Sequence, residues 1–228
     1  MYLNKWYYCL MKLLLTSGGI TNESISKALF ELVGKKPEDT SLAFIPTAAN
    51  IDSGNMDWFI NDLINIKKQN LKFIDIVDIS ALPINIWKPR LEAVDVIFFE
   101  GGNTYYLMEW VNRSGLKDIL PKLLEEKVYV GLSAGSMITN PDLSLKISQV
   151  IYDEDLDKTE DIEGLKFVDF YLLPHLNSKW FPKLREDSIR DIAKDINKKV
   201  YALDDQSAIK VVDGKVEVIS EGDYLVYN

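Results

Sequence analysis

Residues 128–137 read Val-Tyr-Val-Gly-Leu-Ser-Ala-Gly-Ser-Met, a short apolar run that stops at Gly131-Leu-Ser-Ala-Gly135. The run predicts a buried strand, and the two glycines around Ser133 predict a sharp turn into a helix, because a side chain at the tip of such a turn needs neighbours without bulk. The Ser133 hydroxyl would then stand clear of the sheet, beside the N–H group of Ala134, which is suited to binding an oxyanion. The pattern is equally typical of a strand-to-helix turn without chemistry.

Strand and helix patterns alternate on the N-terminal side of this stretch. Apolar runs predict strands at residues 12–16, 42–45, 71–77 and 94–99, and helical spacing of apolar residues follows at 22–34, 56–68, 105–111 and 116–126. A short helix with Pro89 in its first turn is expected at 87–91. The strands are too apolar for a sheet with one solvent-exposed face. We therefore expect an α/β fold with a mostly parallel, doubly wound sheet and helices on both faces.

The C-terminal part adds strands of another kind. Strands are expected at residues 167–173 and 200–203 with a surface helix at 183–196 between them, followed by an antiparallel meander over 207–212, 215–219 and 224–227 that turns at Asp213-Gly214. Antiparallel edge strands near the C-terminus are therefore predicted. We expect residues 11–228 to form a single domain and residues 1–10 to form an N-terminal extension.

Composition limits the function classes. The 228 residues carry a formal net charge of −9, which works against binding to nucleic acid or to an anionic membrane surface. The single cysteine, Cys9, excludes an intramolecular disulfide framework and fits a reducing compartment. Because no convincing signal peptide begins the chain, we expect a cytoplasmic protein with small partners.

A serine hydroxyl needs a base to become a nucleophile, and histidine is the usual base. The chain contains one histidine, His175, directly after the predicted strand 167–173 and Pro174. A lone histidine is more often a surface or core residue than a catalyst. On a doubly wound sheet, however, this strand end would lie at the same edge as Ser133, and this favours a catalytic base.

A carboxylate is then expected to orient the imidazole. Asp205 is the preferred candidate because it follows the predicted strand 200–203. Asp153, with Glu154 and Asp155 beside it, is the alternative. That cluster is more typical of a solvated charge run.

The strand predicted at 94–99 ends in Glu100-Gly-Gly-Asn-Thr104. Glycines let backbone approach a ligand closely, so the Gly101-Gly102 loop is a candidate for a second oxyanion donor. The alternative is a tight connection into a helix capped by Thr104.

Four motifs together carry a resemblance to a known family: Glu100-Gly-Gly-Asn-Thr104, Gly131-Leu-Ser-Ala-Gly135, Pro174-His175 and Leu203-Asp-Asp-Gln-Ser-Ala208. In this order they resemble the dipeptidase E family of serine peptidases, which includes aspartyl dipeptidases and relatives of cyanophycinase. The resemblance implies a fold similar to class I glutamine amidotransferases, with serine in place of their cysteine.

The resemblance also implies roles. Ser133 matches the family's nucleophile, His175 its base, and Gly102 with Ala134 its oxyanion donors. For the third member the family invites two assignments, one at Asp205, which we favour, and one in the region of Asp153.

In aspartyl dipeptidases of this family an arginine early in the helix after the histidine binds the substrate's aspartate, and Arg185 resembles it. A guanidinium suits a carboxylate. An ion pair with an acidic residue one helical turn away is the alternative role for Arg185.

The function that follows is a serine peptidase that hydrolyses short peptides, with Asp-X dipeptides as one candidate class, through an acyl-enzyme on Ser133. No metal or other cofactor is expected, because no cluster of metal-ligand residues is visible in the sequence. The alternatives are a non-catalytic binding or regulatory protein on the same scaffold, and an esterase. The sequence leaves a homodimer as one option.

Overall fold

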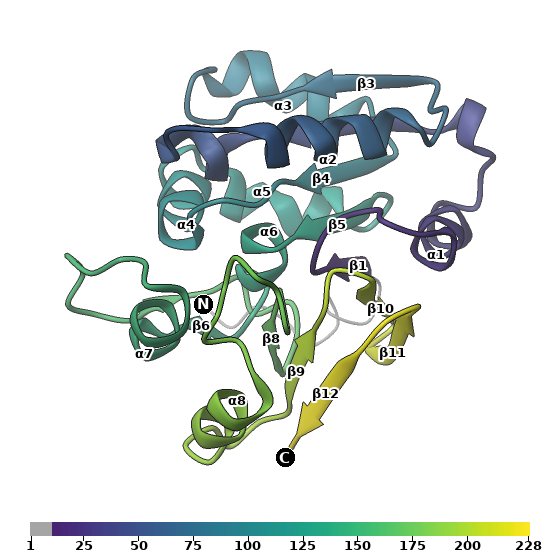
Figure 1. Ribbon diagram of the computed structural model, residues 1–228. Helices are drawn as coiled ribbons and strands as arrows, with labels where there is room; N and C mark the ends of the chain where they lie inside the picture. The colour runs from purple at the N-terminus through teal and green to yellow at the C-terminus, as the bar shows by residue number, and fades with distance from the viewer. Residues whose placement is uncertain (1–10) are drawn as a thin grey trace.

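A computed structural model describes residues 11–228, so the predicted extension at residues 1–10 lies outside the described part. A seven-stranded sheet forms the centre of the molecule, in the order β11-β10-β1-β5-β4-β2-β3 (Figure 1). Strands β1 to β5 are mutually parallel, and β10 runs antiparallel to both β1 and β11. The strands are β1 (Lys12–Thr16), β2 (Ser41–Ile45), β3 (Phe73–Ile76), β4 (Val96–Phe99), β5 (Val128–Leu132), β10 (Ser207–Val212) and β11 (Lys215–Ser220).

Helices cover both faces of this sheet, as predicted. On one face, the strands pack against apolar residues of α1 (Glu23–Val33) and α2 (Asp57–Lys67). On the other face the covering helices are α3 (Ile84–Glu92), α4 (Thr104–Arg113), α5 (Leu116–Leu123) and α6 (Ala134–Met137). The fold is thus the expected mixed α/β arrangement, with apolar side chains alternating between two cores because a strand has a period of two.

Two details of the helices differ from expectation. Pro89 lies in the interior of α3 and not in its first turn. Helix α4 is capped by Asn103 and not by Thr104, because the Asn103 side chain accepts a hydrogen bond of 2.8 Å from the N–H of Tyr106.

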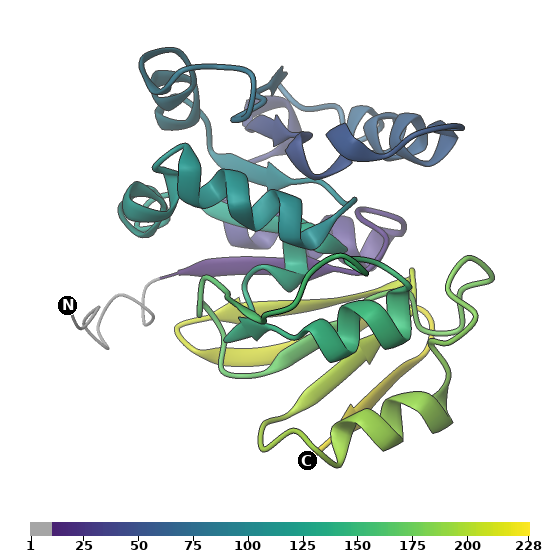
Figure 2. The ribbon, with the colours of Figure 1, turned by 90° about the vertical axis from the view of Figure 1, so that its left-hand side faces the viewer.

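The C-terminal strands divide between two sheets, where the sequence suggested one. β12 (Tyr224–Tyr227) does not continue the meander but pairs with β9 (Val200–Leu203), which is parallel to β8 (Tyr171–Leu173). This small sheet packs with α8 (Glu186–Ala193) around its own apolar core. In Figure 1 it lies below the large sheet, and Figure 2 shows the yellow C-terminal strands beside the purple β1.

Short elements complete the described chain. They are the 3-10 helices Pro37–Asp39 and Thr47–Ile51, the two-stranded ribbon of β6 (Asp142–Leu143) and β7 (Ile162–Glu163), and α7 (Leu145–Ile147) followed by the π-helical turn Ser148–Tyr152. The acidic loop that begins at Asp153 follows this turn.

The register of the parallel strands determines which residues meet at the carboxyl edge. Thr16 of β1 is opposite Leu132 of β5, so Ser17 and Ser133 leave the sheet side by side. On the other side of β5, Phe99 of β4 is opposite Gly131, which places the loop that begins at Glu100 next to Ser133. Open parallel sheets bind ligands at this edge.

Candidate active site

Ser133 lies at the tip of the turn between β5 and α6. Its backbone angles, φ 46° and ψ −107°, are outside the regions that L-residues ordinarily occupy. The flanking glycines allow the close approach of β4, β5 and α6: a Cβ atom at Gly135 would lie 2.2 Å from the carbonyl oxygen of Phe99, and one at Gly131 would lie 2.6 Å from the carbonyl carbon of Gly135. The turn therefore presents Ser133 in a fixed position.

The imidazole of His175 connects Ser133 to Asp205. Its Nε2 lies 2.8 Å from the Ser133 hydroxyl and its Nδ1 lies 2.6 Å from a carboxylate oxygen of Asp205. The sequence suggested that the strand before His175 lies in the same sheet as the strand before Ser133. In the structure His175 follows β8, which belongs to the small sheet. The end of β8 nevertheless meets the carboxyl edge of the large sheet, so the three side chains come together.

Neighbouring side chains restrain the imidazole. The ring of Phe181 stacks on that of His175, with centroids 4.8 Å apart and an angle of 15° between the planes. Tyr152 contacts Phe181 edge to face and donates its hydroxyl to the carbonyl of Pro174. His175 itself has a positive φ of 70°, a conformation that costs energy and persists only where the surrounding structure fixes it.

Asp205 is held by the loop after β1. The Ser17 hydroxyl donates to the carboxylate that binds His175, and the Thr21 hydroxyl donates to the Asp205 carbonyl. A Cβ atom at Gly18 would lie 2.8 Å from that of Asp205, so a glycine is needed there. Although burial opposes ionisation, hydrogen bonds from His175 and Ser17 and the charge of His175 lower the pKa of Asp205, which favours the carboxylate.

The loop of Gly101 and Gly102 packs directly against the Ser133 turn. A Cβ atom at Gly101 would lie 3.3 Å from that of Ser133. Gly102 has a φ of 125°, and a Cβ atom there would lie 2.5 Å from the carbonyl of Ala48. This loop and the start of α6 at Ala134 thus flank the serine, as oxyanion donors from two loops would.

The alternative acid and the predicted specificity residue lie elsewhere. Asp153 pairs with Lys183 at 2.5 Å, whereas the carboxylate hydrogen-bonded to His175 is that of Asp205. Arg185, the residue before α8, donates to the carbonyls of Ser178, Phe181 and Leu184. Within residues 11–228 no acidic side chain pairs with Arg185, so the ion pair considered as its alternative role is not formed.

Sequence reasoning missed Ser17 and Phe181. The signal that could have indicated Ser17 is a polar residue directly after the strand that lies beside the strand of Ser133. Phe181 gave no signal, because its stack on His175 depends on the path of the loop between His175 and α8.

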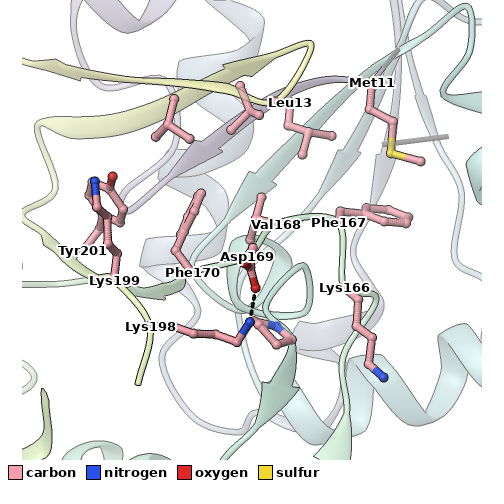
Figure 3. A pocket seen from close by; sticks show the side chains of 14 residues that line it. Met11, Leu13, Lys166, Phe167, Val168, Asp169, Phe170, Lys198, Lys199 and Tyr201 are labelled. Atoms are coloured by element: carbon pink, nitrogen blue, oxygen red, sulfur yellow. Dashed lines mark hydrogen bonds and ion pairs between the residues drawn. The ribbon is translucent and has the colours of Figure 1, made fainter. Parts of the chain in front are cut away.

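A cavity of about 850 Å³ lies at the opposite end of β1, between the two sheets (Figure 3). Met11, Leu13, Phe170 and Tyr201 are among its lining residues, and Lys198 pairs with Asp169 at its border. None of the candidate active-site residues Ser133, His175 and Asp205 lines it. It is therefore separate from the candidate active site.

The described residues also give two findings about other classes of site. They contain no group of three or more histidine, cysteine or acidic residues arranged to hold a metal ion. No helix in the described range 11–228 is long and apolar enough to cross a membrane.

The family model and the relatives that match this sequence are all described as peptidases. The sequence model described as "Peptidase family S51" matches residues 13–219. An uncharacterized peptidase of Pasteurella multocida (PM1590) is 32% identical over 142 residues, which cover 60% of this chain and 66% of that protein. An uncharacterized peptidase of Listeria innocua (Lin0382) is 28% identical over 77% of this chain and 82% of its own length, and a protein named peptidase E from Streptomyces coelicolor is 27% identical over 54% of this chain and 51% of its own.

Two solved structures have the same fold. A crystal structure described as a putative peptidase E protein from Listeria monocytogenes has a TM-score of 0.74 at 23% identity and covers 93% of this chain and 99% of its own. A peptidase from an acI-B1 actinobacterium has a TM-score of 0.68 at 20% identity, with 96% of this chain and 92% of that one covered.

Proposed function

Because the chain belongs to peptidase family S51 and is a serine-type peptidase, we propose that it hydrolyses short peptides through an acyl-enzyme on Ser133. The observation that carries this proposal is the continuous line of hydrogen bonds from Ser133 through His175 to Asp205. A hydroxyl, an imidazole and a carboxylate in this order form the arrangement that activates a serine for attack on a carbonyl carbon.

In the first half-reaction, His175 accepts the Ser133 proton at Nε2 while the serine oxygen bonds to the scissile carbonyl carbon. This requires the tautomer that carries its proton on Nδ1 and donates it to Asp205. The N–H groups of Gly102 and Ala134 would bind the oxyanion. The tetrahedral intermediate collapses as the C–N bond breaks, and the proton on His175 leaves with the amine.

In the second half-reaction, water replaces the amine. His175 takes a proton from the water while the water oxygen bonds to the acyl carbon. It gives this proton to the Ser133 oxygen when the ester bond breaks. The products are a free carboxylic acid and the regenerated serine. Each step leaves Asp205 ionised, in keeping with its lowered pKa.

The restriction to short peptides is supported by the acidic loop that follows Tyr152. Asp155 accepts a hydrogen bond from Asn103, directly after the candidate oxyanion loop, and a second from Ser148. Asp153 pairs with Lys183 of the segment that carries Phe181. The loop thus connects two sides of the site and would limit the length of a bound peptide.

A preference for Asp-X dipeptides is the narrower part of the proposal, and it rests on Arg185. Its guanidinium has no acidic partner in the described chain and lies in the segment that places Phe181 on His175. A carboxylate of the substrate would supply the acidic partner that the Arg185 guanidinium lacks. The test compares Asp-X with Ala-X peptides for the wild type and Arg185→Met: an unchanged ratio of kcat/KM would remove Arg185 from substrate binding.

The main test is release of free amino acids from a dipeptide library by the wild type and by Ser133→Ala. Hydrolysis that Ser133→Ala abolishes supports the proposal. If the folded wild type hydrolyses no dipeptide, the substrate class is wrong. If Ser133→Ala is as active as the wild type, the assignment of the nucleophile is wrong.

A further inference from the structure

Glu100 lies at the base of the loop that flanks Ser133, and its surroundings are unusual for a carboxylate. The residue is 0% exposed. Neither of its carboxylate oxygens has a hydrogen-bond partner within the described residues. Buried charged groups are normally paired, so a group without a partner in a native structure requires an explanation.

The side chain facing Glu100 is Asp62 of α2, and the two carboxyl groups act directly on each other. Val96 and Phe98 of β4 point into the core that contains Ile66 of α2, and Glu100 continues their alternation toward the same helix. Asp62 lies one helical turn before Ile66 and therefore on the same side of α2. Two carboxyl groups thus meet without a donor between them, an arrangement that favours sharing of one proton.

The pair lies beside the proposed catalytic residues. Burial and, to a smaller extent, the Asp205 charge raise the pKa of Asp62 to about 6, against the opposing effects of the neighbouring Glu100 carboxyl group and the His175 charge. Burial and the Asp62 charge raise the pKa of Glu100 well above its usual range. The pair therefore favours a form with one proton, on the fully buried Glu100, and one negative charge, on the more exposed Asp62.

We propose that Asp62, supported by Glu100, binds the free α-ammonium group of the peptide substrate. The inference rests on the proposed function and deepens it, since it makes an unblocked N-terminus a requirement. An α-amino group is two bonds from the scissile carbonyl carbon, and Glu100 is the residue directly before Gly101-Gly102. A single negative charge matches a single ammonium group, which can donate to both oxygens of a carboxylate.

The experiment uses probes that react with the serine itself. Diphenyl esters of a 1-aminoethylphosphonate, one with a free amino group and one N-acetylated, phosphonylate a nucleophilic serine: the Oγ–P bond forms, a P–O bond breaks, and phenol leaves with the serine proton. Rates of Ser133 labelling are compared by mass spectrometry. The variants are Asp62→Asn, Glu100→Gln and, as a matched control, Asp57→Asn at the exposed start of the same helix.

We expect the wild type and Asp57→Asn to react about 100-fold faster with the free-amine probe, in line with a charge-assisted hydrogen bond, and Asp62→Asn to lose at least about 10-fold of this preference. Glu100→Gln supplies an N–H donor toward Asp62 and should lower the preference much less than Asp62→Asn. Equal rates for both probes in the wild type, or the same preference in Asp62→Asn, would overturn the amine site while Ser133 labelling still supports the proposed function. Failure of both probes to label Ser133 would overturn the proposed function and the amine site with it.

Discussion

The hydroxyl of Ser17 donates a hydrogen bond of 2.9 Å to the Asp205 carboxylate and accepts one of 2.7 Å from the backbone N–H of His175. Ser17 is fully buried and directly follows β1 of the large sheet. His175 and Asp205, by contrast, follow strands of the small sheet. Ser17 therefore fixes two of the candidate catalytic residues relative to the strand beside Ser133.

The first prediction follows from this relationship. Ser17→Ala leaves the Asp205 oxygen and the His175 N–H without their partner, and a hydrogen bond to a charged group contributes about 1.5–3 kcal/mol. We expect kcat to fall about 10- to 100-fold, with KM changed less than threefold, because Ser17 positions the catalytic groups and does not contact substrate.

Steady-state kinetics on the best dipeptide check this, with Ser26→Ala of α1 as the control. Ser26 bonds to Gln69, remote from the site, and its loss should leave kcat within twofold. A Ser17→Ala enzyme with wild-type kcat would show that the Ser17 bridge is not needed for catalysis.

The second prediction separates the two candidate acids. Asp205→Asn keeps the shape of the side chain but removes the charge that orients the imidazole, and we expect kcat to fall about 10²- to 10⁴-fold. Asp153→Asn loses only an exposed ion pair with Lys183, so activity should stay within about threefold. The opposite pattern in kcat would place the acid at Asp153.

The third prediction concerns the glycine loop. Gly102→Ala would place a methyl group 2.5 Å from the Ala48 carbonyl at a φ of 125°, so the loop must move away from Ser133. We expect kcat to fall at least about 10-fold, since one oxyanion donor contributes about 10²- to 10³-fold.

The control for Gly102 is Gly54→Ala. Gly54 also has a positive φ, 92°, but a Cβ atom there would have no heavy atom within 4 Å. Gly54→Ala carries only the backbone cost of about 1–2 kcal/mol and should retain wild-type kcat. If both variants lose kcat equally, backbone strain alone accounts for the effect and the Gly102 position carries no special role.

The large sheet could be predicted from the sequence because its strands are continuous apolar runs that end in small or polar residues. The same rule predicts Ser133, His175 and Asp205 at one edge, although His175 follows a strand of the small sheet and not one of the large sheet. Membership of β8, β9 and β12 in a second sheet depends on pairing between distant segments, which local patterns do not encode. Ser17 and Phe181 depend on the same long-range packing.

The last prediction uses the carboxyl pair to link stability with pH. The folded pKa values of Glu100 and Asp62 are raised above their unfolded values, so the native state holds protons that the unfolded chain has lost. Stability contributed by each group is therefore complete below its unfolded pKa and falls as pH rises toward the folded pKa, by about 1.4 kcal/mol per pH unit and group. For Glu100 this loss begins near pH 4.5, its ordinary pKa, and extends well above that pH.

Glu100→Gln removes this loss and gives Asp62 an N–H donor. We expect its Tm at pH 7.5 to exceed that of the wild type by several degrees, since about 1 kcal/mol corresponds to about 2–4 °C for a chain of this size. The difference should shrink as pH falls to 4.5, whereas Glu38→Gln, an exposed control, should follow the wild type throughout. Calorimetry at both pH values measures this difference in Tm. A difference that does not change with pH, or a Glu100→Gln protein that is less stable than the wild type at pH 7.5, would contradict the prediction. Glu100 would then be ionised in the native state and stabilised by a cation absent from the described contacts.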